Sequence, residues 1–270
     1  MAITTRNGAR TWVLRDTKES LRRYLVWLGG LTVFLVAARY ISEQTLWVFV
    51  WDAPAQVQDF LSRMFPPDVR YFNRISLALW DTINIAVFGT LLGLVVAFPL
   101  GIMAAKNTTP HALLRTVALT LIVAARSINT VIWAMLLVIV TGPGLFAGVL
   151  AIAIRSVGMI GKMFYETIEE TNREPIEAVT ATGASPAQVF AYGYLPQLMP
   201  AYVGITVYRW EVNIRESTIL GLVGGGGIGL LLNSAINRLA WNQVIVVLIT
   251  ILATVFVAEV VSNRIRGAVT

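Results

Sequence analysis

Cysteine is absent from the 270 residues, and His111 is the only histidine. Without cysteine the chain has no disulfides, no thiol catalysis and no thiolate metal ligands, and a single histidine is too few for a typical zinc or haem centre. We therefore expect no metal site. Gly161-Lys162 lacks both the preceding glycine and the following hydroxyl of a phosphate-binding loop, so we expect no ATP site in this chain either.

Charged residues are also scarce. Asp, Glu, Lys and Arg make up 13% of the chain, apolar residues make up 56%, and the mean hydropathy is +0.70. This composition leaves too little polar surface to cover a soluble globule of this size. The net charge is +6, but the basic residues flank the apolar runs instead of forming one basic face, which argues against a nucleic-acid partner. Membrane lipid is the expected surrounding.

Apolar runs of about 20 residues, the length of helix that crosses a bilayer, recur along the chain. They predict an all-α integral membrane protein with about six transmembrane helices. The expected spans are Tyr24–Ile41, Asp81–Ala105, Leu114–Val140, Leu145–Ile168, Leu198–Leu220 and Trp241–Val261.

The basic residues between these spans predict the topology. Arg22 and Arg23 precede the first span, and Arg264 and Arg266 follow the last. Because cytoplasmic segments carry an excess of Lys and Arg, we expect both termini in the cytoplasm. Arg39 stands where a signal-peptide cleavage site would need small neutral residues, so we expect the first helix to be retained.

Two parts of the chain differ in composition. Residues 1–75 hold the cytoplasmic N-terminus, the first span and an aromatic-rich segment, and residues 76–270 hold the remaining spans. Val57, Phe60, Leu61 and Met64 fall at helical spacing and predict a helix lying in the headgroup region. An ordinary extracytoplasmic loop is an equally good interpretation of this segment.

Residues 169–197 are too polar to cross a bilayer, and their sequence predicts two short helices. Pro175 suits a first helical position, Gly183 suits the residue after a helix, and Ser185-Pro186 suits the start of the next. Leu195-Pro196 is expected to stop the second helix. The small residues of the first helix would let a groove on a soluble partner approach closely; a solvated helical hairpin is the alternative.

The order of residues in this loop resembles a known pattern. Glu177-Ala178, Gly183 five residues later and Leu195-Pro196 resemble the EAA loop of permeases from bacterial ATP-binding-cassette (ABC) importers. The resemblance implies that these residues form the contact with an ATPase subunit. Val179 and Gly193 depart from the pattern, where alanine and a branched apolar residue are usual.

A larger part of the chain, about residues 80–265, resembles the phosphonate-type permeases. The likeness lies in Arg126-Ser127-Ile128-Asn129, in 148–162 and above all in 208–229. It implies a five-helix, MetI-like permease core with an added N-terminal helix, in the bacterial inner membrane. It also implies a transport subunit without catalysis of its own, in a homodimer with two ATPase subunits that bind ATP and Mg and with an extracytoplasmic phosphonate- or phosphite-binding protein.

Several charged and amide side chains fall inside the expected spans, where a charge facing lipid is unfavourable by about 2.5–3.5 kcal/mol. Glu211 and Arg215 are four residues apart and are expected to form an ion pair, and Glu216 is expected to neutralise a second arginine. The two remaining cations suit passage of a small anion. Bonding to backbone carbonyls or across the dimer is the alternative role. The candidate path residues are Arg126, Asn129, Arg155, Arg209, Asn213, Arg215 and Glu216.

The glycine run Gly224, Gly225, Gly226 and Gly227 follows the fifth span, where it would suit either the hinge of an outer gate or a plain flexible turn. Two other function classes remain. An ion-coupled secondary carrier for a small anion would use Glu211, Glu216 or Glu259, but we find no inverted repeat. A membrane-embedded enzyme would need a buried base or metal ligand, and His111 lies outside the expected spans.

Overall fold

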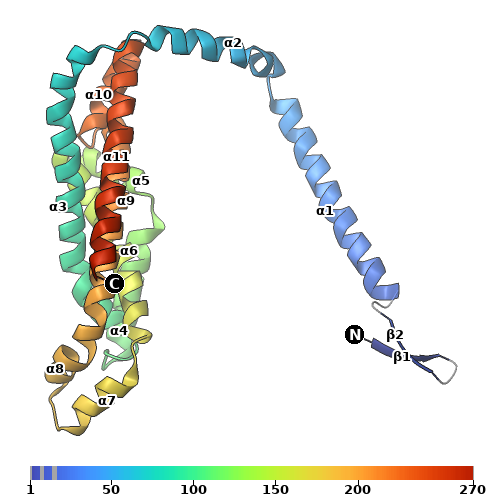
Figure 1. Ribbon diagram of the computed structural model, residues 1–270, viewed down its shortest axis with the longest axis vertical. Coiled ribbons are helices and arrows are strands. Elements are labelled where there is room, and N and C mark those ends of the chain that lie inside the picture. The colour runs from blue at the N-terminus through green and yellow to red at the C-terminus, as the bar shows by residue number, and fades with distance from the viewer. Residues whose placement is uncertain (1, 7–8, 14–16, 270) are drawn as a thin grey trace. The chain divides into compact units, whose positions relative to one another are not determined.

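The structure is a computed structural model that describes residues 2–6, 9–13 and 17–269, with side chains described from Ser20 to Ala268. It divides into two units, residues 1–60 and 61–270, which are described separately. Every element from Thr17 onward is helical. Figure 1 labels the elements along the chain.

The N-terminal unit begins with a two-stranded antiparallel hairpin, β1 (Ala2–Arg6) and β2 (Ala9–Val13), in which Ala2 lies opposite Val13. The all-α prediction did not include this hairpin. Its sequence signal is Asn7-Gly8, a dipeptide typical of two-residue hairpin loops.

Helix α1 (Thr17–Gln44) follows, with 28 residues and a length of about 42 Å. Between Tyr24 and Ala38 it carries no charged side chain, and its side chains there are all exposed within the chain, as expected of a helix whose solvent is lipid. The ion pair between Arg39 and Glu43, at 2.8 Å, lies in its last two turns. The expected span Tyr24–Ile41 is contained in α1.

Helix α2 (Trp47–Met64) confirms that the aromatic-rich segment is helical. Asp52, Gln56, Asp59 and Arg63 are spaced to form one polar face, and Gln56 donates a 2.7 Å hydrogen bond to Asp52. Of the apolar positions predicted from the sequence, Val57, Leu61 and Met64 fall on a different face of the helix, and Phe60 falls between the two faces. Its placement in the headgroup region stays a prediction.

The second unit is a helical bundle that continues from the end of α2. After the 3-10 turn η1 (Val69–Tyr71), its longest helices run lengthwise, with the short helices of the 169–197 segment at one end (Figure 1). The helices outside that segment are α3 (Phe72–Ala104), α4 (Ala112–Ser127), α5 (Thr130–Thr141), α6 (Leu145–Glu169), α9 (Leu195–Leu220), α10 (Ile228–Asn237) and α11 (Trp241–Val269).

Helices α3 and α6 pack closely against each other. Gly89, Gly93 and Gly101 of α3 face Ile152, Ser156 and Phe164 of α6, and a Cβ added at each glycine would lie 2.5–2.6 Å from those side chains. Gly89 and Gly93 form the small-xxx-small spacing that lets two membrane helices approach closely. Small residues at these positions therefore fix the contact between the two helices.

Within the described residues, four helices are long and apolar enough to cross a membrane, and two bent helix pairs raise the number to six if each pair is one span. The third expected span, Leu114–Val140, is one of these pairs: α4 and α5 meet at 90°. Asn129 explains the break, because its side chain accepts a 3.0 Å hydrogen bond from the Val131 N–H and so starts a new helix. The second pair bends by 42° between the α9 region and α10.

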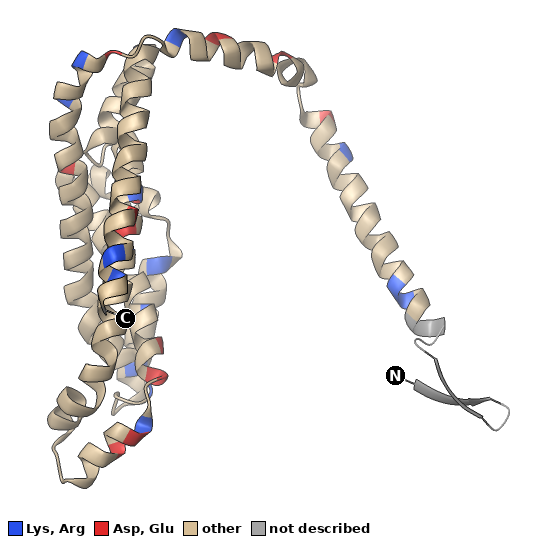
Figure 2. Cartoon of the chain, in the orientation of Figure 1, with Lys and Arg blue, Asp and Glu red and all other residues tan. Residues whose placement is uncertain are grey.

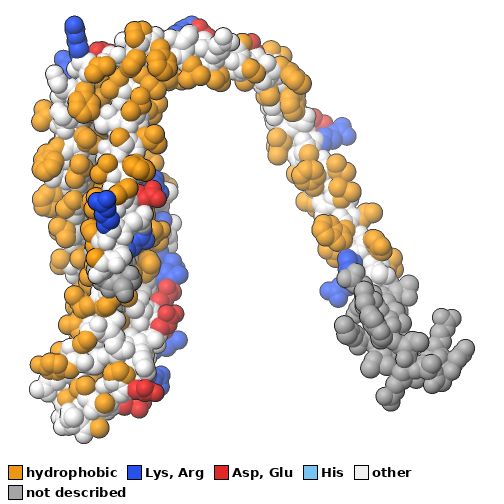
Figure 3. All heavy atoms as spheres, in the orientation of Figure 1, with side chains coloured by type: hydrophobic (Ala, Val, Ile, Leu, Met, Phe, Trp, Pro, Cys, Tyr) orange, Lys and Arg blue, Asp and Glu red, His pale blue; other side chains and the backbone are white. Residues whose placement is uncertain are grey.

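Charged residues are distributed as expected of a membrane protein. They gather on α2 and near α7 (Arg173–Ala181), with few along the middle of the long helices (Figure 2). The side chains on the visible face of the long helices are mostly hydrophobic (Figure 3). The charges that lie within the bundle are therefore the ones that need a structural or functional explanation.

Candidate translocation and coupling sites

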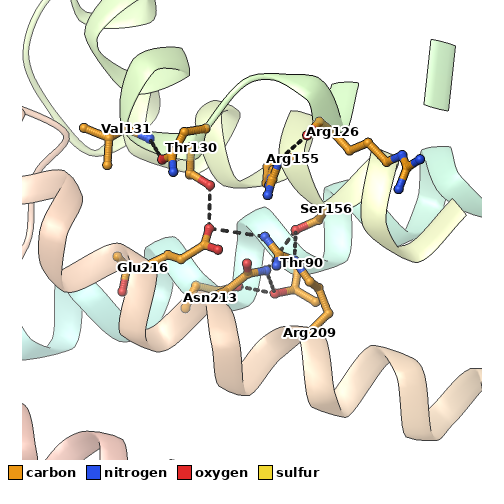
Figure 4. Close-up of polar contacts among 12 residues, drawn as sticks. Thr90, Arg126, Thr130, Val131, Arg155, Ser156, Arg209, Asn213 and Glu216 are labelled. Atoms are coloured by element: carbon orange, nitrogen blue, oxygen red, sulfur yellow. Dashed lines mark hydrogen bonds and ion pairs between the residues drawn. The ribbon is translucent and has the colours of Figure 1, made fainter. Parts of the chain in front are cut away.

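An ion pair from two turns of the same helix forms the centre of the polar contacts inside the bundle. Arg209 in α9 is 5% exposed, and its Nη2 lies 3.2 Å from the Glu216 Oε2. The same carboxylate oxygen accepts a 2.5 Å hydrogen bond from the hydroxyl of Thr130, at the start of α5 (Figure 4). The sequence-based expectation that Glu216 neutralises a second arginine is confirmed.

Asn213, on the same helix, extends these contacts to α3 and α6. Its Nδ2 donates to the Thr90 Oγ1 at 2.7 Å and to the Ser156 Oγ at 2.9 Å, and its side chain is fully buried. The Arg209 Nε lies 3.3 Å from the same Ser156 hydroxyl. We call this set the central network; it joins α3, α5, α6 and α9 through Thr90, Thr130, Ser156, Arg209, Asn213 and Glu216.

Sequence reasoning missed Thr90, Thr130 and Ser156. A threonine or serine in an apolar run ordinarily bonds to its own helix, as Thr90 also does with the Ala86 carbonyl at 2.6 Å. The available signal was the glycine spacing of α3, which marks the face on which Thr90 and its neighbours meet α6.

Arg155 and Arg126 meet at the break between α4 and α5. Arg155 Nη1 donates to the backbone carbonyl of Arg126 and, at 3.2 Å, to that of Ile128. Carbonyls at a helix C-terminus have no partner within the helix and carry partial negative charge, so the guanidinium stabilises the end of α4. The structure thus favours the alternative role, bonding to backbone carbonyls, for Arg155.

The Arg126 side chain behaves differently. It is half-buried and points away from the central network (Figure 4). Neither Arg126 nor Arg155 forms an ion pair within residues 20–268, so the two cations expected to lack a carboxylate partner are these two. Asn129 is exposed and its side-chain oxygen caps α5.

A second ion-pair group lies on another face of α9. Arg215 Nη2 is 3.7 Å from the Glu211 Oε1, which confirms the expected pair. Glu211 Oε2 is also 3.6 Å from Nη2 of Arg266, and the Arg266 guanidinium lies 5.9 Å from the centre of the Tyr208 ring. Arg266 belongs to α11, so the spacing of residues along α9 does not predict that contact. The Arg215 side chain remains 53% exposed.

The 169–197 segment forms a compact projection at one end of the bundle. Helix α7 ends before Gly183, which has φ +78°, and α8 (Pro186–Val189) begins at a capping box in which the Ser185 N–H donates to the Gln188 side chain at 2.8 Å. The predictions for Gly183 and Ser185-Pro186 are therefore confirmed.

Two predictions in this segment are wrong in detail. Asn172 caps α7, so Pro175 is the third helical residue and not the first. Leu195-Pro196 does not stop the second helix, because the chain passes from α8 through the π-helical segment η2 (Phe190–Tyr194) directly into α9. Pro196 stands in the first turn of α9, where a missing N–H removes few helical hydrogen bonds.

The projection has a hollow on its surface that contains two of the predicted coupling residues. Ala178 and Gly183 line it together with Val179, Thr182, Ala184, Gln188 and Tyr192. Glu177, which precedes Ala178 in the sequence, is exposed on α7. Leu195 and Pro196 are not among the residues that line the hollow and lie at the base of the projection. Gly193, the departure from the family pattern, has a packing role: a Cβ there would lie 3.2 Å from the Ile176 Cα of α7.

The glycine run forms a packed turn that connects the 3-10 turn η3 (Gly221–Val223) to α10. Gly224, Gly226 and Gly227 have positive φ, between 77° and 90°, and a Cβ at Gly227 would lie 2.5 Å from the Thr82 hydroxyl. That hydroxyl accepts a 2.8 Å hydrogen bond from the Ile228 N–H. The turn needs glycine for both conformation and space, and the gate-hinge role stays a prediction.

No group of three or more potential metal-ligating His, Cys, Asp or Glu side chains occurs within the described residues. The polar contacts inside the bundle are instead those of arginine with carboxylate, hydroxyl and carbonyl oxygens. Their chemistry suits helix–helix fixation and the recognition of anions.

Comparison with known proteins places this geometry in context. Residues 97–269 match the model of the family described as binding-protein-dependent transport system inner membrane component. A putative phosphite transport system permease protein of Stutzerimonas stutzeri is 40% identical over 207 residues, 77% of this chain and 73% of the relative. A phosphite transport system permease protein of the same organism is 38% identical, over 87% of this chain and 85% of the relative.

A solved structure shares the fold. A chain of the inward-facing MetNI methionine ABC transporter aligns with a TM-score of 0.65 and 21% identity, over 75% of this chain and 99% of that one. At this identity the likeness supports the fold, and the expected MetI-like permease fold is confirmed.

Proposed function

Because the chain belongs to the family of inner membrane components of binding-protein-dependent transport systems, we propose that it forms the path by which phosphonate or phosphite crosses the inner membrane in an ABC importer. The observation that carries the substrate class is the similarity, at 40% and 38% identity, to two phosphite permeases. The chain itself is a multi-pass membrane protein and a transport permease.

The proposed assembly has two copies of this chain, two ATPase subunits and an extracytoplasmic binding protein. Both termini and the projection formed by α7, α8 and η2 face the cytoplasm, in agreement with the basic residues beside them. ATP and Mg are held by the ATPase subunits. Closure of those subunits displaces the projection through Glu177, Ala178 and Gly183 and changes the tilt of the helices connected to it.

Within the bundle we assign the arginines to two roles. Arg209, with Asn213 and Glu216, is buried and paired, so it fixes helices to one another. Arg126 is the candidate for contact with a passing anion, because it is half-buried at the break between α4 and α5 and has no carboxylate partner within residues 20–268. Arginine presents a planar set of donors that suits oxyanions, and one exposed contact keeps binding weak enough for release.

Of the three carboxylates that an ion-coupled carrier would use, Glu211 and Glu216 lie in ion pairs with arginines, and Glu259 is exposed on α11. The match to the family of inner membrane components of binding-protein-dependent transport systems supports the ATP-driven importer over the secondary carrier.

The test is purification of the tagged chain from native membrane in detergent, followed by identification of what co-purifies. We expect an ATPase in equal amount. Reconstitution of that complex in liposomes with its binding protein should give uptake that requires ATP, and titration of the binding protein with phosphite and with methylphosphonate should identify the substrate. A chain that purifies alone and transports solute without ATP would instead be a secondary carrier.

A further inference from the structure

A set of polar contacts at the end of α6 connects the projection to the turn between α3 and α4. Glu169, the last residue of α6, accepts a 2.9 Å hydrogen bond from the Lys106 backbone N–H at its Oε1. Nη2 of Arg115 lies 3.9 Å from the same oxygen, and Nζ of Lys106 lies 3.8 Å from Oε2. One carboxylate therefore contacts the α3–α4 turn and the first turn of α4.

The α3–α4 turn is itself ordered by side chains that bond to the last carbonyls of α3. Thr108 and Thr109 donate to the carbonyls of Ile102 and Met103, each at 2.6 Å, and Arg115 Nε donates to that of Ala104 at 3.1 Å. Asn107 Nδ2 donates in the other direction, to the carbonyls of Ile168 and Glu169 at 3.3 and 3.4 Å. Side-chain to backbone hydrogen bonds therefore run in both directions between the α3–α4 turn and the end of α6.

The connection from Glu169 to the projection is short. Three residues separate Glu169 from Arg173, where α7 begins, and Gln197 Nε2 of α9 lies 3.4 Å from the carbonyl of Asn172 in that interval. An apolar cluster beneath the projection contains Ala105, Phe164, Ile168, Tyr194 and Leu198, and Ile176 of α7 packs against it. Because no flexible linker separates α6 from α7, a displacement of α7 also moves the end of α6.

We propose that Glu169 transmits movement of the projection to α3 and α4, as a positioning residue for coupling between ATP hydrolysis and transport. This inference rests on the proposed function. Its physical basis is that the Lys106 and Arg115 side chains are 64% and 34% exposed, so water replaces their lost contacts if the group separates during the cycle. The contacts at Glu169 are thus able to break and re-form, whereas a fully buried pair would resist separation.

The experiment uses the whole complex in liposomes and measures phosphite or methylphosphonate uptake and ATP hydrolysis on the same preparation. Glu169→Ala should lower the uptake per ATP hydrolysed by at least about fivefold, the lower end of usual coupling between two sites. Glu169→Gln keeps an acceptor for the Lys106 N–H but loses the charge, and should give an intermediate ratio. Glu170→Gln is the matched control: the neighbouring carboxylate is exposed, and its removal should leave the ratio unchanged.

The ratio separates coupling from folding, because a purely structural defect lowers uptake and hydrolysis together and lowers the melting temperature. An unchanged ratio in Glu169→Ala would overturn the proposal. If Glu169→Ala does not assemble with the ATPase, Glu169→Gln provides the test of the proposal. A wild-type ratio of uptake to ATP hydrolysis in Glu169→Gln would overturn the role of the charge. A wild-type complex without ATP-dependent uptake would instead defeat the proposed function, whatever the variants do.

Discussion

The central network and the contacts around Glu169 use the same residue types in different surroundings. The two carboxylates, Glu216 and Glu169, are similarly exposed, at 26% and 23%. The cations differ: Arg209 in the central network is 6% exposed at the side chain, whereas Lys106 and Arg115 around Glu169 are 64% and 34% exposed. Breaking a buried ion pair is strongly unfavourable because it leaves an unpaired charge in the protein interior. Breaking an exposed pair changes the free energy little because water solvates both partners. The first therefore suits permanent fixation of helices, and the second suits a contact that changes during function.

The largest expected effect is that of Glu216→Gln, which tests the buried side of this contrast. The substitution keeps the size of the side chain but leaves the Arg209 guanidinium buried without a counter-charge. We expect a loss of about 3–5 kcal/mol in stability. Thermal unfolding in detergent measures it, with Glu259→Gln as control because Glu259 is exposed on α11. Equal melting temperatures for the two variants would remove the distinction between buried and exposed charges.

Gly93→Ala tests whether the central network depends on the close approach of α3 to α6. The new Cβ would lie 2.5 Å from the Cβ of Ser156, so the helices must separate, and we expect a loss of about 1–3 kcal/mol. Gly204→Ala in α9 is the matched control, because nothing lies within 4 Å of the added atom. The melting temperatures of the two variants give the comparison, and a Gly93→Ala protein as stable as Gly204→Ala would contradict this packing.

Arg126→Ala sharpens the contrast between fixation and function within the bundle itself. The loss of one charged contact to the substrate should lower ATP-dependent uptake about tenfold, for an interaction of about 1.5 kcal/mol. Assembly with the ATPase should be unchanged, since Arg126 makes no ion pair within residues 20–268. Arg126→Lys keeps the charge without the planar fork and should retain part of the uptake. Wild-type uptake in Arg126→Ala would remove this residue from the path.

Lys106→Ala has the smallest expected effect and tests the exposed side. Its Nζ lies 3.8 Å from the Glu169 Oε2 and is largely in solvent, so the loss of stability should be below about 1 kcal/mol. The backbone N–H that bonds to Glu169 is retained. A shift in melting temperature as large as that of Glu216→Gln would show that the two groups are not energetically different.

The sequence predicted contacts that lie within one helix better than contacts between helices. The Glu211–Arg215 pair follows from a spacing of four residues, but its third member, Arg266, lies on α11 and was not predicted. Thr90 and Ser156 were missed for the same reason, because each also looks like an ordinary small residue of an apolar helix. The break of the third span at Asn129 was missed because the apolar run continues on both sides of it.

The sequence by itself determined the membrane class, the approximate position of most apolar helices and the turn of the projection at Gly183 and Ser185-Pro186, because hydropathy and caps act over a few neighbouring residues. The resemblance in 177–196 and 208–229 supplied the family. Only the tertiary structure decided that Arg209 pairs with Glu216, that Arg126 has no carboxylate partner within residues 20–268, and how Glu169 contacts the α3–α4 turn. Those outcomes depend on which helices lie side by side, and residues some 50–120 positions apart, such as Asn213 with Thr90 and Ser156, meet only when the bundle has formed.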